Sequence, residues 1–298
     1  MGKPWFIYAL ITTLFWGVWG AFAEFPTRHG FPETLVYVVW TLTMIPPALY
    51  AMQRVGWRVQ RNGKSILLGS LIGFTGAGGQ MLLFHAVHTG PTYLIFPVIA
   101  LSPVVTIGLS MVFLRERVTR IGAIGVLLAL VALPLFNYSP ATEAGAGQGV
   151  TWFIYALIVL LAWGVQGYFM KLANATMDAE NIFLYMTLTS LLLVPVALGM
   201  TDFSVPIEYG WQGPGLAAVT QILNAVGALT LVYAFRYGRA LVVAPLANAG
   251  APMITAIVSM IVLGVVPNTV TVVAIVLAFL AAALLAIEPE DKLVEQPV

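Results

Sequence analysis

Long apolar stretches separated by short polar breaks run along almost the whole chain. Ten of these stretches reach 19 residues or more, and they cover residues 5–24, 33–53, 65–88, 92–114, 118–137, 152–171, 180–199, 213–236, 240–263 and 269–287. A helix needs about 20 apolar residues to cross a hydrocarbon core of about 30 Å. The pattern therefore predicts an all-α polytopic membrane protein with ten transmembrane helices.

The composition agrees with lipid as the solvent for most of the surface. Hydrophobic residues make up 60% of the 298 residues and charged residues only 8%, whereas a soluble domain carries about 25% charged residues. Cysteine is absent, which excludes a disulfide framework and a thiol nucleophile. The net charge is +1, and the charged residues lie in short clusters and form no basic face, so we expect no nucleic-acid partner.

The first apolar stretch returns in the middle of the chain. The seven residues from Trp5 to Ile11 recur unchanged from Trp152 to Ile158, 147 positions later, and Trp16-Gly17 recurs at the same offset as Trp163-Gly164. This duplication predicts two related halves. We place a first repeat at residues 1–138 with helices 1–5, a polar linker at 139–151, a second repeat at 152–289 with helices 6–10 and a tail at 290–298.

Basic residues set the orientation. With the N-terminus inside, 12 of the 13 Lys and Arg residues fall on the cytoplasmic side and only Arg28 lies outside. We therefore expect the protein to lie in the inner membrane, with both termini in the cytoplasm. Because each half has five spans, an odd number, the second half must have the opposite orientation in the membrane. Inverted repeats of this kind hold substrate near the bilayer midplane. Lys3 and Ala21-Phe22-Ala23 also fit a signal peptide, whereas the internal copy of this run favours a retained first helix.

Several motifs in these positions resemble a known family. Trp-Gly occurs in the first helix of each half, and the second copy is followed seven residues later by Lys171. The fourth helix carries Ser102-Pro103 and ends in Leu114-Arg115-Glu116-Arg117-Val118-Thr119, before Gly122 and Gly125. This order is similar to that of EamA-type transporters of the drug/metabolite transporter superfamily. Glu24 stands at the position that matches Lys171, and Val265 stands where Glu116 would repeat. The resemblance implies alternating-access transport of small metabolites, commonly the export of amino acids or similar compounds.

Polar and aromatic side chains near the middle of the spans are the candidates for substrate contact, because buried polar groups in a membrane are costly unless they are paired or face water. Amides offer donors and acceptors without charge and suit a neutral or zwitterionic solute. The alternative role for each is interhelical hydrogen bonding or packing. The predicted substrate-binding residues are Trp16, Gln80, Ser102, Trp163, Gln166, Gln221, Asn224 and Asn248.

Two prolines fall on the fourth helix of each half, and we predict hinges at Pro97, Pro103, Pro245 and Pro252. Broken helices at matching positions of two repeats indicate a transporter site, although a static kink is the other interpretation. Two histidines, His85 and His88, lie at i, i+3 near the outer end of the third helix. Two histidines alone make a poor metal site, so we predict no metal, and proton sensing is a further hypothesis for His85.

Three functional interpretations compete. The main prediction is a transporter that exports amino acids or related amphipathic compounds, and the first alternative is a sugar or nucleoside uptake permease. A non-transporting membrane receptor or scaffold is the alternative from another class. The sequence has no His-Glu-x-x-His or Gly-x-Ser-x-Gly motif, and we predict neither an enzyme nor a cofactor. The aliphatic helices at 118–137 and 269–287 are expected to face lipid or to form a homodimer.

Overall fold

The computed structural model describes residues 4–113, 119–136, 150–237, 247 and 250–286, and within these residues it is helical, with no strand. The helices are α1 (Pro4–Phe22), α2 (Phe25–Arg28), α3 (Glu33–Arg54), α4 (Gly63–Thr89), α5 (Thr92–Ile99), α6 (Pro103–Phe113), α7 (Arg120–Phe136), α8 (Thr151–Asn174), α9 (Ala179–Leu192), α10 (Val194–Met200), the π-helical turn η1 (Trp211–Gly215), α11 (Leu216–Tyr237), α13 (Gly250–Leu263) and α14 (Thr269–Ala286). Of the predicted linker at 139–151, only residues 150 and 151 are described, and the tail at 290–298 lies outside the described residues.

The apolar helices identify the chain as a polytopic membrane protein. Within the described residues, seven spans are long and apolar enough to cross a bilayer: Trp5–Arg28, Glu33–Arg54, Gly63–Thr89, Thr92–Phe113, Thr151–Asn174, Ala179–Met200 and Trp211–Ala234. Three further apolar helices are shorter, at Arg120–Ala132, Gly250–Leu263 and Thr269–Leu284. The first part of the span predicted at 240–263 lies largely outside the described residues. All ten predicted positions therefore carry an apolar helix, but three of these helices are too short to count as spans by themselves.

Two predicted spans are interrupted in the structure. The stretch at 92–114 forms α5 and α6, separated by a turn in which the backbone N–H groups of Leu101 and Ser102 donate to carbonyls three residues earlier. Proline at position 103 has no N–H to continue the α-helical pattern, so the break precedes it. The stretch at 180–199 forms α9 and α10, and its break at Leu193 lies two residues before Pro195.

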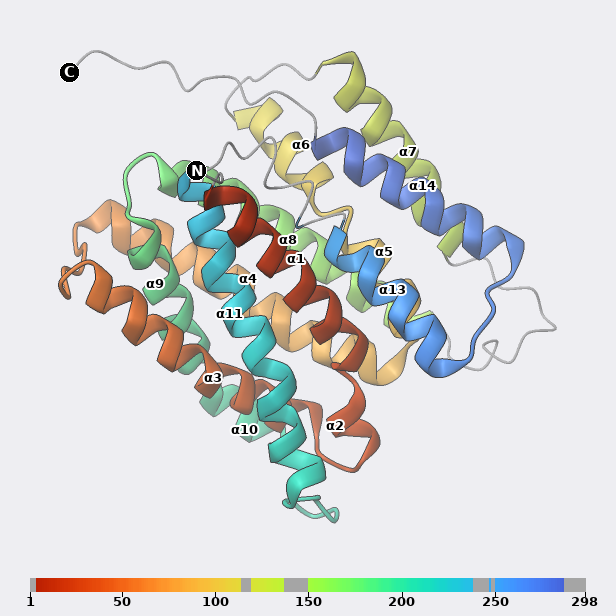
Figure 1. Cartoon of the computed structure of the whole chain (residues 1–298), viewed down its shortest axis with the longest axis horizontal. Helices are drawn as coiled ribbons and strands as arrows, with labels where there is room; N and C mark the ends of the chain where they lie inside the picture. The colour runs from red at the N-terminus through yellow and green to blue at the C-terminus, as the bar shows by residue number, and fades with distance from the viewer. Residues whose placement is uncertain (1–3, 114–118, 137–149, 238–246, 248–249, 287–298) are drawn as a thin grey trace.

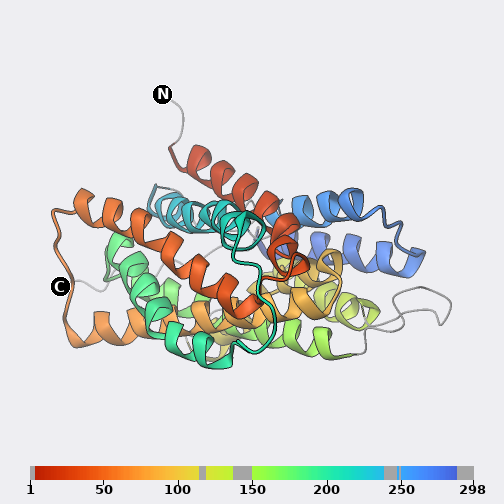
Figure 2. The same cartoon turned by 90° about the horizontal axis from the view of Figure 1, so that it is seen from below.

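The helices lie in two layers (Figures 1 and 2). One layer contains α1, α11 and α13, and the other contains α4, α8, α5 and α6. At one end of the molecule α3 packs against α9 and α11, whereas α7 and α14 pack against each other at the opposite end. Ala129 of α7 and Ala278 of α14 have no exposed surface, while Leu127 and Val276 on the same helices are half exposed. This pair therefore packs through alanines and presents an aliphatic outer face.

Glycines in α1 allow it to approach α13 closely. A Cβ atom on Gly17 would lie 2.6 Å from the Cβ atom of Ile254, so only glycine fits this crossing. At the same place the Oγ1 hydroxyl of Thr255 donates to the carbonyl of Gly17 at 2.9 Å. Small residues and interhelical hydrogen bonds are the usual means of holding helices together in lipid, where apolar burial contributes little.

The second half repeats this crossing between α8 and α6. A Cβ atom on Gly164 would lie 2.8 Å from the backbone carbonyl of Ser102, and Thr106 Oγ1 donates to the Gly164 carbonyl at 2.8 Å. Gly164 follows Gly17 by 147 positions, and Thr106 precedes Thr255 by 149. The first helix of each half therefore crosses the fourth helix of the other half in the same way.

The substitution Gly164→Ala should destabilise the protein, because backbone atoms of Ser102 stand where the new methyl group would lie. Overpacking of this kind costs about 1–3 kcal/mol. Gly108→Ala on α6 is the matched control, since a Cβ there would meet nothing within 4 Å. Thermal unfolding in detergent should show a lowered Tm for Gly164→Ala and an unchanged or raised Tm for Gly108→Ala. Equal Tm values for the two variants would contradict the crossing.

Candidate functional site

Three tryptophans and two amides form a hydrogen-bonded group, here called the tryptophan–amide cluster, where α1, α3 and α11 meet. The indole N–H of Trp19 donates to Gln221 Oε1 at 2.9 Å, and that of Trp40 donates to Asn224 Oδ1 at 2.7 Å. The indole N–H of Trp16 donates to the backbone carbonyl of Asn224 at 3.1 Å. Both side-chain amide oxygens are therefore held by indoles from other helices.

The cluster leaves an amide donor free in the protein interior. Because an indole can only donate, its bond to Oε1 fixes which end of the Gln221 amide carries the nitrogen. The side chain of Gln221 is completely buried, and its Nε2 has no hydrogen-bond partner within the described structure. Unsatisfied buried donors cost about 1–3 kcal/mol, and their usual explanation is a function or a bound molecule. Gln221 therefore offers a donor to a solute or to water.

The other layer presents a related arrangement on α4 and α8. Trp163 packs on Gly79, and its indole N–H donates to the backbone carbonyl of Gly76 at 3.3 Å. Gln166 lies one turn further along α8, with its amide against Gly76. Gln80 is 4% exposed, and its Nε2 also has no partner among the described residues. Each layer thus contributes one buried glutamine with a free donor.

The contacts of Trp16 and Trp163 occupy equivalent positions in the two repeats. Trp16 packs on Gly227 of α11 as Trp163 packs on Gly79 of α4. The tryptophans lie 147 positions apart, and the two glycines lie 148 apart. In each case the indole also donates to a carbonyl three residues before the glycine. The first helix of one half therefore docks on the third helix of the other half by the same contact.

The remaining predicted residues are less well defined. Ser102 lies half-buried at the break between α5 and α6, and Asn248 lies outside the described residues. Its neighbour on the same predicted helix, Pro245, also lies outside them.

Three of the four prolines predicted as hinges lie in described helices, and their role as hinges stays a prediction. Pro97 is buried inside α5, where it removes one backbone donor. Pro103 is the first residue of α6, and the first turn of a helix needs no intrahelical N–H bond. The interruption lies directly before it, at residues 100–102. Pro252 lies in α13, and residues 248 and 249 before that helix are outside the described residues.

Sequence reasoning missed Trp19 and Trp40 as members of the site. Both are buried at 3% and 6% exposure, and each satisfies one amide. The spacing of three residues between Trp16 and Trp19 places both on one face of α1, and this was the available signal. The position of Trp40 in the middle of its span gave a second one.

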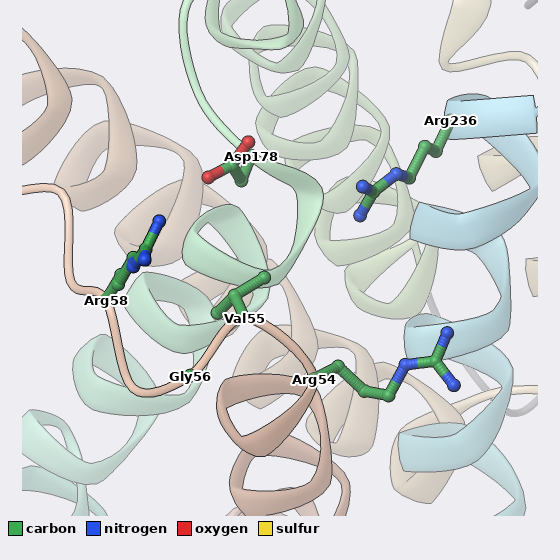
Figure 3. A pocket seen from close by; sticks show the side chains of 6 residues that line it. All are labelled: Arg54, Val55, Gly56, Arg58, Asp178 and Arg236. Carbon is green, nitrogen blue, oxygen red and sulfur yellow. The ribbon is translucent and has the colours of Figure 1, made fainter.

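A cavity of about 430 Å³ opens at the end of the molecule that the positive-inside pattern places in the cytoplasm (Figure 3). It lies where α3 and α11 end and α9 begins. Its lining is rich in arginine and consists of Arg54, Val55, Gly56, Arg58, Asp178 and Arg236. Arg236 is paired with Glu180, so the guanidinium groups of Arg54 and Arg58 beside Asp178 leave this cavity a small surplus of positive charge, which favours anionic groups.

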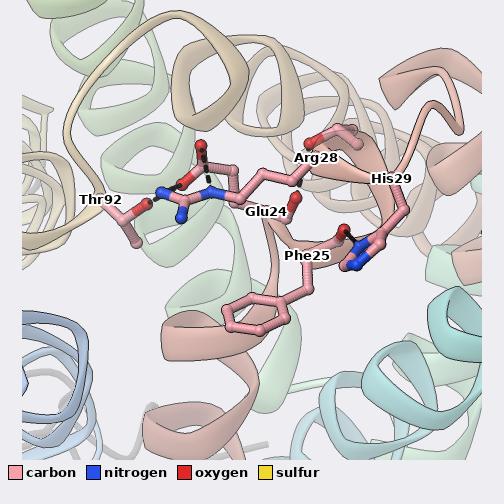
Figure 4. A network of polar contacts seen from close by, with 6 residues as sticks. Glu24, Phe25, Arg28, His29 and Thr92 are labelled. Atoms are coloured by element: carbon pink, nitrogen blue, oxygen red, sulfur yellow. Dashed lines mark hydrogen bonds and ion pairs between the residues drawn. The ribbon is translucent and has the colours of Figure 1, made fainter. Parts of the chain in front are cut away.

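A polar network marks the predicted outer end of α1 (Figure 4). Glu24 accepts hydrogen bonds from Arg28 at 3.0 Å and from Thr92 Oγ1 at 3.2 Å. The Glu24 side chain is 18% exposed, whereas Thr92 is almost fully buried. Glu24 therefore ties the turn after α1 to the start of α5, which is a positional role at the end of the span.

The substitution Trp19→Phe should keep the ring but remove the donor that satisfies Gln221 Oε1. A buried acceptor without its partner costs about 1–3 kcal/mol, so thermal unfolding should show a clearly lowered Tm. Trp211→Phe is the control, because Trp211 is 72% exposed. If both variants unfold at the temperature of the parent protein, Gln221 finds another donor and the cluster is not the structural unit described.

Comparison with known proteins agrees with this architecture. A curated protein of Methanocaldococcus jannaschii, described as uncharacterized, is 31% identical over 61 residues, and the match spans 20% of this chain and 44% of that protein. A solved crystal structure of 17% sequence identity superposes with a TM-score of 0.63 over 93% of this chain and 95% of its own, which shows a shared fold. The family model described as the EamA-like transporter family matches residues 3–138 and 150–287, one match in each half. The chain therefore belongs to the EamA-like transporter family, a family of membrane transporters and not of enzymes.

Proposed function

We propose that this transporter moves amino acids or related amphipathic compounds out of the cell by alternating access. In this proposal ten transmembrane helices form two inverted five-helix repeats, with both termini in the cytoplasm and the protein in the inner membrane. No catalytic step, metal or cofactor takes part. The helix pair α7 and α14 faces lipid or a second copy of the chain.

The observation that carries the proposal is the pair of buried glutamine donors. Gln80 belongs to the third helix of the first half, and Gln221 belongs to the third helix of the second half. Both amide nitrogens are buried without a partner within the described residues. Donors contributed by both halves suit a solute held between them, because a solute bound in this way is released when the halves move apart.

The arginine-lined cavity supports the substrate class and the direction. Arg54 and Arg58 lie at the cytoplasmic end in the predicted topology, where an exported solute enters. Guanidinium groups bind carboxylates in preference to the neutral hydroxyl groups of sugars and nucleosides. In this proposal the indole rings of Trp16 and Trp163 contact the apolar part of an amphipathic solute.

Flux measurements in proteoliposomes test this function with the near-isosteric substitutions Gln80→Met and Gln221→Met. Each removes one amide donor, and loss of a hydrogen bond to a charged group costs about 1.5–3 kcal/mol. We expect kcat/KM for the transported amino acid to fall about tenfold or more in both variants. Tm should stay near that of the parent for Gln80→Met and fall for Gln221→Met, which also removes the acceptor of the Trp19 indole. Gln53→Met on the exposed end of α3 is the matched control and should transport normally.

The same assay separates the competing functions. Transport of sugars or nucleosides without transport of amino acids would contradict the proposed substrate class. No flux of any of these compounds by a folded, reconstituted protein would contradict the transporter function itself and favour a receptor or scaffold. Full activity of both glutamine variants would remove Gln80 and Gln221 from the binding site.

A further inference from the structure

A carboxylate–histidine pair connects two helices at the predicted outer end. His85 Nδ1 of α4 lies 3.2 Å from Glu33 Oε1 at the start of α3. The edge of the imidazole ring meets Tyr155 of α8, with ring centroids 4.6 Å apart and planes at 84°. The side chains of His85 and Glu33 are 39% and 21% exposed, and they lie near the end of α4 and at the start of α3, the ends that the predicted topology places outside.

A carboxylate–arginine pair stands at the predicted inner end. Arg236 of α11 donates to Glu180 Oε1 at the start of α9, and the Glu180 side chain is only 2% exposed. Tyr233, one turn before Arg236, lies beside Tyr8 of α1 with ring centroids 5.4 Å apart. The second carboxylate oxygen of Glu180 is buried without a partner among the described residues.

The repeat relates these two groups. Glu180 follows Glu33 by 147 positions, and Tyr155 follows Tyr8 by the same number. His85 corresponds to Tyr233 at an offset of 148. Each half therefore carries a glutamate at the start of its second helix, and that glutamate binds a basic side chain near the end of its third helix. An aromatic ring from the first helix of the other half completes each group.

Each pair joins a helix that packs mainly against one layer to a helix of the other layer. Apart from α9, helix α3 packs chiefly on α11, yet Glu33 binds to α4 in the other layer. Helix α9 packs chiefly on α4, yet Glu180 binds to α11. A bond of this kind resists separation of the layers at its own end of the molecule. The outer and inner pairs thus join helices at opposite ends of the molecule.

The chemical difference between the pairs decides what each responds to. Arginine keeps its charge at every physiological pH, whereas histidine gains or loses its charge between about pH 5 and 8. We propose that His85 and Glu33 form a proton-binding site that closes the outer side of the transporter when it is occupied. The proposal rests on the alternating-access function above and adds a proton as the ligand that biases it.

The direction of the pH effect follows from the charges of His85 and Glu33. With His85 protonated and Glu33 ionised the pair attracts, and this attraction is lost as rising pH removes the proton. On the elements packed against this end of α4, the other titratable side chains are Tyr37 of α3, Tyr155 of α8 and Tyr93 of α5, and tyrosines do not titrate in this range. His88 on α4 itself is exposed. The titratable groups of α9, Glu180 and Tyr185, lie toward the inner end.

Cysteine accessibility tests the site without any transport measurement, and the chain has no cysteine of its own. Gln80→Cys places a buried reporter on α4 between His85 and the middle of the span. A membrane-impermeant maleimide is added outside right-side-out vesicles at pH 5.5 and 8.0. Labelling of Tyr209→Cys, an exposed position after α10, normalises for the intrinsic effect of pH on thiol reactivity.

In the reporter background the normalised labelling rate should rise about two- to fivefold from pH 5.5 to 8.0, the range of a partly exposed ion pair. Adding His85→Gln should give the high rate at both pH values, and His85→Arg the low rate at both. His88→Gln should keep the parent's response. An unchanged rate in the reporter background, or a response that survives His85→Gln, overturns the proton site.

Flux in the cysteine-free parent separates this inference from the proposed function. Transport together with pH-independent labelling would overturn the proton site and leave the transporter function standing. Labelling that responds to pH through His85, in a protein that moves no substrate, would uphold the proton site and overturn the function. A Tm measured for every variant confirms that the folded protein is being compared.

Discussion

The contact of the first helix of each half with the other half is the constraint on which the rest of the structure depends. In lipid, helices gain little from burying apolar surface and are held by close packing and hydrogen bonds. Gly17 and Gly164 bring the backbones together, and Thr255 and Thr106 donate to the carbonyls of those glycines. Because each first helix docks on the opposite half, neither half can form its packing surface alone.

This exchange of helices also builds the candidate site. The tryptophan that precedes each glycine points to the third helix of the other half, where Trp16 meets Asn224 and Trp163 meets Gly76. On the α11 side, two further indoles hold the amides of Gln221 and Asn224 by their oxygens. Such a rigid frame presents amide nitrogens to the interior at fixed positions, which lowers the cost of ordering them when a solute binds.

Much of this could be predicted from the sequence, and the rest depends on packing. Apolar runs located the helices because the bilayer sets their length, and the copied Trp-Gly motif predicted two halves. Sequence gives the depth of a residue but not the helix that it meets, so the partners of Gln221 and Gln80 could not be named. Trp40 was overlooked because its partner Asn224 lies on a helix 184 positions away. The break at 100–102 lies just before the predicted hinge at Pro103, and the break at Leu193 was not predicted, because proline acts on the residues before it.

The distance between α4 and α11 at the two ends of the molecule tests the central claim, which is that the halves move against each other around a site between them. Spin labels replace His88 of α4 and Trp211 of η1, directly before α11, at the predicted outer end, and Lys64 of α4 and Tyr237 of α11 at the inner end. All four are exposed positions in a cysteine-free chain. Pulsed electron resonance then reports each distance with and without a transported amino acid. Alternating access predicts that substrate shortens one distance and lengthens the other. Two distances that stay fixed, or that change in the same direction, would contradict the account.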